Sequence, residues 1–541
     1  MKRTLSSSLL VLSLSLLNLM LLPPSRSAAQ PRAPDPRFGI VEAFFNPEAA
    51  SEAGAGYTRI ILRWDVIQPT SPADWKPANV PDPIIAGELA AGREVIGLLI
   101  GTPAWAQANP DDPADARAVP DMFHWKAFVR GMAQHYRGRI RHWIIWNEPD
   151  VWMPDHPGST WTGTEEDYYQ LLKTAYLAIK EVDPALQVQM AGLTYYWDSE
   201  YGRPQYLDRL LDIIVADPEA PANDYYFDTV VYHLYFNPLQ TVEVLDETRE
   251  SLARHGIADK EIWINETNAP PSDDPQEPPR YTPRLQVSME EQAAFIIQQY
   301  ALAFSAGASR VEVYKLRNTA DHPESTEPFG LLRADDSPRP AFTAYQLVTT
   351  YLRDFRRAYQ EEQGEGLAVT FDRDDQTTTV VWNTSRSPAL MQVNAIAAQA
   401  LLVDERGQTT TLIPVDGRYT VDLPGAACTQ ETFCFIGGAP RLLVEGAHAN
   451  DRVALAPSAT PAASPSPEPT TTATSIPAST PTATPIVQSD ITETHTSPTL
   501  QATTATPAPL AQEPGNGLGV LAVALGVIAL ISTLGIAWLR R

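Results

Sequence analysis

Two glutamates of this 541-residue chain stand at equivalent places, each after an asparagine and at the end of a β-rich apolar segment. Glu148 follows Asn147 and precedes Pro149, and Glu266 follows Asn265. Two carboxyl groups about 5–5.5 Å apart can cleave a glycosidic bond with retention, because one protonates the leaving oxygen while the other attacks the anomeric carbon. The sequence therefore predicts glycoside hydrolysis if the fold brings these two side chains together.

Short β-rich segments alternate with helical patterns between Phe38 and Leu352. Thr164 with Asp167, and Ser288 with Glu291, have the spacing of capping boxes, which mark where two of the helices begin. The alternation predicts a parallel sheet covered by helices. The predicted strands are Phe38–Phe45, Thr58–Arg63, Glu94–Ile100, His142–Trp146, Gln187–Leu193, Thr229–Tyr235, Glu261–Asn265 and Arg310–Lys315.

Eight such units favour an α/β fold with a closed (β/α)₈ TIM barrel over residues 37–352. An open doubly wound sheet is less favoured, because no glycine-rich phosphate turn follows the first segment. Functional groups of such a barrel lie at the C-terminal ends of its strands. Glu148 and Glu266, after the fourth and seventh strands, are therefore expected to meet across the mouth.

Residues 360–455 change to alternating strands without helices, which predicts a small all-β, sandwich-like accessory domain. Packing against the barrel is favoured over sugar binding, since no binding site is visible in the pattern. Cys428 and Cys434 are the two cysteines of the chain, and their spacing leaves open whether they form a disulfide.

The two ends of the chain have the composition of targeting segments. Residues 1–29 combine Lys2 and Arg3 with an apolar run and small residues, as in a cleaved secretory signal. Residues 456–514 are rich in Pro, Thr, Ser and Ala, which predicts a disordered linker. Residues 518–539 are free of charges and precede two arginines, which predicts a single transmembrane helix with the head outside the cell.

The composition narrows the classes of partner and cofactor. A formal net charge of −25 repels polyanions, so nucleic acid is not an expected partner. Two cysteines are too few for a disulfide framework or an iron–sulfur cluster. No histidine and carboxylate spacing indicates a metal site, and no cofactor is expected.

These residues and their order resemble the clan A retaining glycoside hydrolases, and the sequence motifs are most similar to those of family 39-like or family 5-like members. The resemblance covers about residues 37–350 and implies that Glu148 is the acid/base and Glu266 the nucleophile. It further implies substrate-binding or positioning roles for four residues. The amide of Asn147 would bind the sugar 2-hydroxyl, and the imidazole of His233 would face the sugar. Arg59 would lie near the nucleophile, and the phenol of Tyr235 would donate a hydrogen bond to it.

Aromatic residues near the expected mouth leave two interpretations open. Trp105, in a segment resembling the family 39-like cleft wall, and Trp64 are either substrate-binding or ordinary core residues. Tyr195, Tyr196 and Trp197 are a stacking surface for sugar rings or packing under a loop. Tyr314-Lys315 ends the eighth strand where many clan members have a tryptophan, which leaves the floor of the sugar site undefined.

The expected function is therefore hydrolysis of O-glycosidic bonds in an oligo- or polysaccharide by double displacement. A catalytically inactive glycan-binding surface protein and a transglycosylase are the alternatives. The sequence does not identify the sugar, the linkage or whether the action is exo or endo.

Overall fold

The structure is a computed structural model of the chain, and it describes residues 33–279, 283–319 and 328–446. The predicted signal peptide, linker and transmembrane helix lie outside these residues, so all three stay predictions. Within the described part of the chain, no helix combines the length and the apolar character needed to span a bilayer.

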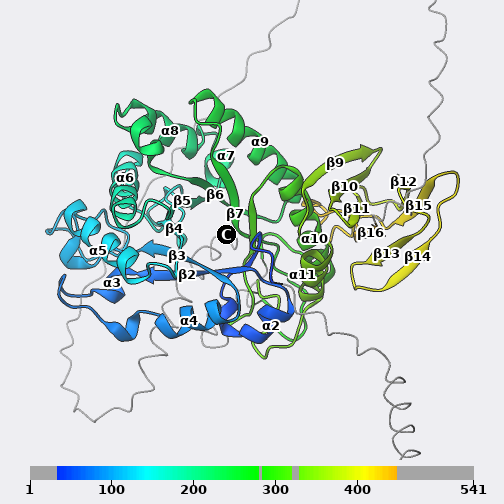
Figure 1. Cartoon of the computed structure of the whole chain (residues 1–541), viewed down its shortest axis with the longest axis horizontal. Coiled ribbons are helices and arrows are strands. Elements are labelled where there is room, and N and C mark those ends of the chain that lie inside the picture. The colour runs from blue at the N-terminus through cyan, green and yellow to red at the C-terminus, as the bar shows by residue number, and fades with distance from the viewer. Residues whose placement is uncertain (1–32, 280–282, 320–327, 447–541) are drawn as a thin grey trace, which may run out of the picture. The chain divides into compact units, whose positions relative to one another are not determined.

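Eight parallel strands close into a barrel, which confirms the predicted (β/α)₈ architecture (Figure 1). The closure is made by the first and last strands, where Phe38, Gly39 and Ile40 pair with Val311, Glu312 and Val313. The strands are β1 (Phe38–Ile40), β2 (Tyr57–Arg63), β3 (Glu94–Ile100), β4 (His142–Ile145), β5 (Gln187–Leu193), β6 (Thr229–Tyr235), β7 (Glu261–Asn268) and β8 (Arg310–Val313).

Helices lie around the outside of the barrel (Figure 1). Both predicted capping boxes are present: Thr164 with Asp167 begins α6, and Ser288 with Glu291 begins α10. The helices are α2 (Pro47–Glu52), α3 (Trp64–Ile67), α4 (Asp82–Ala90), α5 (Met122–His135), α6 (Glu165–Val182), α7 (Tyr196–Glu200), α8 (Tyr206–Ala216), α9 (Pro238–Arg254), α10 (Met289–Ser305) and α11 (Pro340–Tyr351).

Two strands differ from their predicted ranges. β1 ends at Ile40, because Glu42 adopts a left-handed backbone (φ 61°) and the following Ala43–Phe45 form a short 3₁₀ turn. β7 extends to Asn268, so Glu266 lies inside the strand instead of after it. The register with β8 shifts between Ile264 and Thr267, which is an irregularity around Glu266 that an apolar pattern does not encode.

The barrel and the domain after it, residues 37–455, are called the head. Its second part is all-β, as predicted, with a six-stranded antiparallel sheet and a separate two-stranded sheet. Its first strand begins at Arg357, three residues before the predicted start of the domain. Phe371 of this sheet packs on Phe304 of α10 and on Phe355, so barrel and sheet share one hydrophobic core. The strands are β9 (Arg357–Gln363), β10 (Gly366–Asp372), β11 (Gln376–Asn383), β12 (Ala389–Asn394), β13 (Ala400–Asp404), β14 (Thr409–Leu412), β15 (Arg418–Leu423) and β16 (Arg441–Gly446).

Candidate active site

Glu148 is positioned by a strained turn at the end of β4. Trp146 and Glu148 both have positive φ angles, 74° and 43°, a conformation that non-glycine residues adopt only where the surroundings impose it. The buried indole of Trp146 donates to the carbonyl of Thr160 (2.8 Å), and the Glu148 amide donates to the carbonyl of Gly192 on β5 (3.0 Å). These contacts fix the backbone from which the Glu148 side chain projects.

Glu266 is buried and both of its carboxylate oxygens accept hydrogen bonds. Arg59 of β2 donates to Oε1, and the Tyr235 hydroxyl of β6 donates to Oε2 (2.6 Å). Burial raises the pKa of Glu266, but the charges of His233 and Arg59 and the hydrogen bonds from Tyr235 and Arg59 outweigh burial and hold that pKa below its usual range. The carboxylate is therefore kept ionised, as a nucleophile must be.

His233 links the two carboxylates. Its Nδ1 lies 2.6 Å from Glu148 Oε1 and 3.5 Å from Glu266 Oε2. Burial lowers the pKa of His233, but the negative charges of Glu266 and Glu148 outweigh burial and raise it. The imidazole reaches this place because residue 192 is glycine: a Cβ there would lie 2.0 Å from His233 Nε2.

The two glutamates are close enough for the retaining mechanism. One oxygen of each carboxylate and one imidazole nitrogen of His233 all lie within 4.8 Å of one another. That spacing is near the roughly 5–5.5 Å of retaining enzymes and well below the roughly 6.5–9.5 Å that leaves room for water in inverting ones. The same three groups have the spacing of metal ligands, but Arg59 and Tyr235 already occupy both oxygens of Glu266, which favours acid–base chemistry over cation binding.

The other residues predicted from the resemblance lie at different depths. Asn147 is half-buried in the turn beside Glu148 and forms an isolated parallel bridge with Gly192. Trp64 is fully buried and stacks on Phe128 (5.1 Å between ring centroids), so its surroundings are those of a core residue. Trp105 is half-buried, meets Trp64 edge-on and donates from its indole to the carbonyl of Gln68 (2.7 Å).

The three aromatic residues after β5 differ in burial. Tyr195 is half-buried and donates to Glu247 (2.8 Å), and Trp197 is buried against the ring of His156. Tyr196 is half-buried. Packing therefore describes the position of Trp197, while Tyr195 and Tyr196 keep partly exposed rings.

An aromatic cluster packs around Tyr235, which donates to Glu266, where the sequence left the floor of the site undefined. The ring of Tyr235 lies 5.5 Å from that of Phe329 and 6.4 Å from that of Tyr314, and these rings pack with Val41 in one buried group. Lys315 is buried beside Tyr314, with Nζ 3.5 Å from a carboxylate oxygen of Glu42. Its charge is thus opposed by a neighbouring carboxylate.

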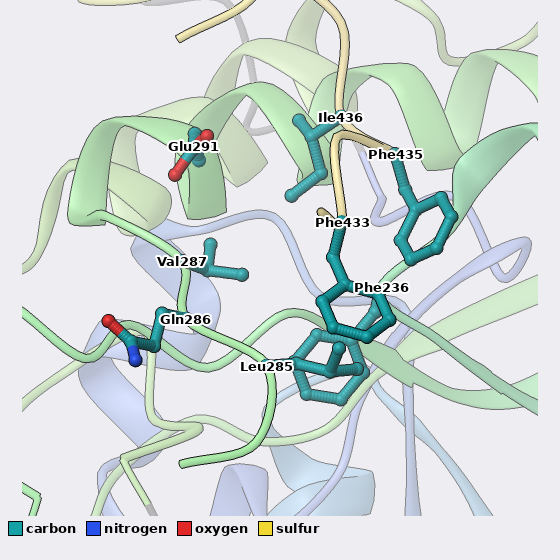
Figure 2. Close-up of a pocket in the computed structure, with 8 residues that line it drawn as sticks. All are labelled: Phe236, Leu285, Gln286, Val287, Glu291, Phe433, Phe435 and Ile436. Atoms are coloured by element: carbon teal, nitrogen blue, oxygen red, sulfur yellow. The ribbon is translucent and has the colours of Figure 1, made fainter. Parts of the chain in front are cut away.

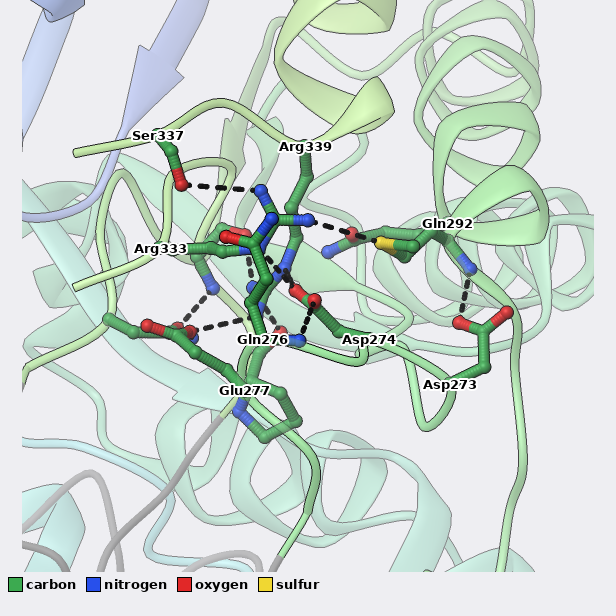
Figure 3. A network of polar contacts seen from close by, with 12 residues as sticks. Asp273, Asp274, Gln276, Glu277, Gln292, Arg333, Ser337 and Arg339 are labelled. Atoms are coloured by element: carbon green, nitrogen blue, oxygen red, sulfur yellow. Dashed lines mark hydrogen bonds and ion pairs between the residues drawn. The ribbon is translucent and has the colours of Figure 1, made fainter. Parts of the chain in front are cut away.

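A buried ionic network ties the loop after β7 to the segment after β8 (Figure 3). The guanidinium groups of Arg333 and Arg339 both donate to Asp274 Oδ2 (2.8 Å each), and Arg339 also donates to Glu277 (3.0 Å). Arg339 further donates to the carbonyls of Pro328 and Gly330, which flank Phe329. The network therefore holds Phe329 against Tyr235.

A pocket lies between the barrel and the loop closed by the Cys428–Cys434 disulfide (Figure 2). The Thr429 amide donates to Glu291 (2.9 Å), which attaches this loop to α10. The lining is mostly apolar and contains neither candidate catalytic glutamate. It consists of Phe236, Leu285, Gln286, Val287, Glu291, Phe433, Phe435 and Ile436.

Several buried residues near the site were missed by sequence reasoning. Gly192 lies inside a predicted strand and would have been noticed only as a glycine in a strand interior, which often marks a close approach. Asp150 is buried and accepts from the amide (2.6 Å) and hydroxyl (2.8 Å) of Thr194, and burial, reinforced by the Glu148 charge, raises its pKa to about 7. In the sequence, Asp150 could have been noticed only because it stands two residues after Glu148. Glu312 lies wholly buried on β8, with no sequence signal apart from its charge within an apolar strand.

Comparisons with known proteins agree with this arrangement. The model of the family described as glycosyl hydrolases family 39 matches residues 113–410. Over 71 residues the chain is 35% identical to a β-xylosidase of Caldicellulosiruptor saccharolyticus, a match that spans 12% of this chain and 14% of that protein.

Two solved structures share the fold. One is a family 39 glycoside hydrolase from the gut symbiont Bacteroides cellulosilyticus WH2, with a TM-score of 0.58 and 19% identity over 76% of this chain and 82% of that one. The other is a GH39 β-xylosidase from Caulobacter crescentus, with a TM-score of 0.52 and 15% identity over 76% of this chain and 97% of that one.

Proposed function

Because the chain belongs to glycosyl hydrolase family 39, a clan A family, we propose that it hydrolyses O-glycosidic bonds of oligo- or polysaccharides with retention at the anomeric carbon. The observation that carries this proposal is the pair Glu148 and Glu266, whose closest carboxylate oxygens lie within 4.8 Å while Arg59 and Tyr235 hold Glu266 ionised.

The first chemical step forms a covalent glycosyl-enzyme. Glu266 attacks the anomeric carbon while Glu148 gives its proton to the glycosidic oxygen, so the leaving group departs as a neutral alcohol. The amide of Asn147 is proposed to bind the sugar 2-hydroxyl, an interaction that strengthens as positive charge develops on the ring.

The second step releases the sugar. Glu148, now a carboxylate, takes a proton from water, and the resulting hydroxide attacks the anomeric carbon and displaces Glu266. His233, 2.6 Å from Glu148 Oε1, is placed to hold that carboxylate in position through both steps. The enzyme returns to its starting protonation state, and two displacements restore the original anomeric configuration.

β-Xylosides are the first substrates to test, because two of the similar proteins are named β-xylosidases. A screen of aryl β-glycosides, with xyloside, glucoside, galactoside and arabinoside members, identifies the sugar in the site. A parallel screen of oligosaccharides and polysaccharides separates exo from endo action.

Removal of the nucleophile tests the proposal directly. Glu266→Ala should abolish hydrolysis of every substrate, because no glycosyl-enzyme can form. Azide should restore turnover of an activated aryl glycoside and yield a glycosyl azide of inverted configuration, since a single displacement replaces two. Near wild-type activity of Glu266→Ala would overturn the assignment of the nucleophile.

The assignment of Glu148 is tested by the leaving group. Glu148→Ala should slow substrates with poor leaving groups far more than activated aryl glycosides, which need little protonation. Equal losses on both classes would contradict the acid role. A pure glycan-binding protein would give no turnover with any substrate, and a transglycosylase would give products longer than the substrate.

We also propose that the chain is exported and anchored in the cell membrane, with its catalytic head outside the cell. This rests on the composition of residues 1–29, 456–514 and 518–539, which resemble a signal peptide, an extended linker and a membrane span.

A further inference from the structure

An exposed aromatic pair lies on the loops that follow β4 and β5. Trp152 is 40% exposed and Tyr201 is 50% exposed, and their ring centroids are 5.5 Å apart in an edge-to-face arrangement. Trp152 is the most exposed tryptophan among the described residues. Two neighbouring aromatic rings that are both partly exposed form a surface that an apolar or amphipathic ligand can cover.

Arg203, itself anchored to the buried Asp198, holds Trp152 in place. The guanidinium of Arg203 lies 4.5 Å from the centre of the Trp152 ring, and the backbone of Arg203 is fixed by a hydrogen bond from its amide to the carbonyl of Asp198 (2.8 Å). The carboxylate of Asp198 is 2% exposed and lies 3.5 Å from Arg203 Nε. The surface is therefore supported before any ligand arrives, which lowers the entropic cost of binding.

The same loops carry the proposed acid. Trp152 follows Glu148 by four residues, so their Cα atoms are at most about 14 Å apart. Asp150, between them, accepts hydrogen bonds from the amide and hydroxyl of Thr194, which joins the β4 loop to the β5 loop. Because the acid protonates the leaving oxygen, the leaving group lies on the Glu148 side of the mouth.

We propose that Trp152 and Tyr201 form a platform that binds neutral pyranose rings of the leaving group, so that the preferred substrates are oligosaccharides extended on that side. The apolar C–H face of a pyranose ring covers an aromatic face, while its hydroxyls remain solvated or bonded to polar neighbours. The inference rests on the proposed glycosidase function and deepens it, because it assigns a binding surface beyond the bond that is cleaved.

The test compares two substrates on the same variants. One is an aryl β-glycoside of the sugar that the wild-type enzyme accepts, and the other is an oligosaccharide with three or more rings on the leaving-group side. Trp152→Ala should lower kcat/KM for the oligosaccharide about tenfold, mainly through KM, and should change the aryl glycoside less than about twofold. Tyr201→Ala should act in the same direction with a smaller effect, because Tyr201 offers a smaller ring.

Conservative and binding controls separate the platform from a folding effect. Trp152→Phe and Trp152→Tyr keep an aromatic face and should recover most of the loss on the oligosaccharide. The free oligosaccharide that corresponds to the leaving group should inhibit Trp152→Ala less strongly than wild type. Equal losses of Trp152→Ala on both substrates, or no loss on either, would overturn the platform while the wild-type activity still supports the glycosidase. A wild-type protein without activity on any glycoside would overturn the proposed function and the platform with it.

Discussion

At the scale of single residues, the environment of Glu266 decides what its carboxylate can do. Arg59 and Tyr235 come from two different strands and each donates to one of its oxygens. Burial raises the pKa of Glu266, but Arg59, Tyr235 and the charge of His233 together lower it by more, so this pKa is held below its usual range. An ionised, buried and hydrogen-bonded carboxylate is expected to remain a nucleophile down to acidic pH.

Tyr235→Phe removes one of these donors without changing the ring. The pKa of Glu266 should rise, because the hydrogen bond from Tyr235 favours the ionised form. Activity needs ionised Glu266, so the acid limb of the profile of kcat/KM against pH should move to higher pH. At the optimum, kcat/KM should fall roughly 10- to 100-fold, as expected for loss of a hydrogen bond to a charged group.

Tyr232→Phe is the matched control for this variant. Tyr232 lies on the same strand and is buried, but its hydroxyl accepts from Thr248 on α9 (2.9 Å) instead of meeting a carboxylate. The Tyr232→Phe variant should lose some stability and keep the acid limb of the wild-type profile of kcat/KM against pH. The same shift in both variants would contradict a specific role of Tyr235.

Glu312 is a second buried carboxyl near the site and differs from Glu266 in its titration. Burial raises the pKa of Glu312 from 4.5 to about 8, and the Arg59 charge opposes this shift without cancelling it. The native state therefore binds a proton that the unfolded chain has lost between about pH 4.5 and 8. This group accordingly makes the protein less stable as pH rises through that window.

Glu312→Gln should remove that loss of stability. Above pH 8 the variant should be more stable than wild type by up to roughly 5 kcal/mol, and the difference should disappear near pH 4, where both side chains are neutral. Thermal unfolding followed from pH 4 to 9 measures this. Parallel curves for the two proteins would show that Glu312 is already ionised in the native state.

At the scale of elements, the segment between β8 and α11 supports Tyr235, the hydrogen-bond donor to Glu266, through Phe329. Arg339 donates to the carbonyls of Pro328 (2.9 Å) and Gly330 (2.7 Å). The side-chain amide of Asn268 donates to the carbonyl of Phe329 (2.7 Å). The backbone of Phe329 is thus fixed on both sides, and its ring packs on Tyr235. Loops after β7 and β8 therefore act on Glu266 without touching it.

Phe329→Leu should loosen this support while keeping an apolar side chain. We expect kcat/KM to fall several-fold, with the acid limb shifted to higher pH in the same direction as for Tyr235→Phe, because the phenol is less well held. Phe304→Leu is the matched control: Phe304 is buried in α10, and its ring contacts Phe38 and Phe355. A Phe304→Leu variant with the same loss of activity would reduce the role of Phe329 to general stability.

At the scale of the whole molecule, barrel and β-sheet domain form one packed head. Phe371 of the sheet meets Phe304 and Phe355, and Gln298 of α10 exchanges two hydrogen bonds of 3.0 Å with the backbone of Gly437 and Gly438. These contacts agree with a packing role for the accessory domain. We therefore expect the head to keep its activity when it is separated from the residues that follow it.

External proteolysis of intact cells tests this expectation and the proposed location together. A protease that cleaves within residues 456–514 should release a soluble, active head, because that segment has the composition of an unfolded linker. Activity should appear in the supernatant and leave the cells. Cleavage that occurs only after lysis would reverse the proposed topology, and release of an inactive head would contradict the independence of the fold.

The sequence by itself determined the barrel, its strand order and the association of the two glutamates with the fourth and seventh strands, although Glu266 lies inside β7 and not after it. These features are local: alternation of apolar segments, capping boxes such as Thr164 with Asp167, and a polar residue where an apolar run stops. Such patterns predict which element a residue belongs to and at which end of the barrel it lies.

The tertiary structure decided which side chains meet. The register shift that surrounds Glu266, the space beside Gly192 that admits His233, and the burial of Trp64 depend on how neighbouring strands and helices pack. Arg339 meets Asp274 across 65 positions of sequence, a contact that no local pattern encodes. The physical reason is that closing the barrel fixes strand register and side-chain direction together, so contacts between distant residues exist only once all eight strands are paired.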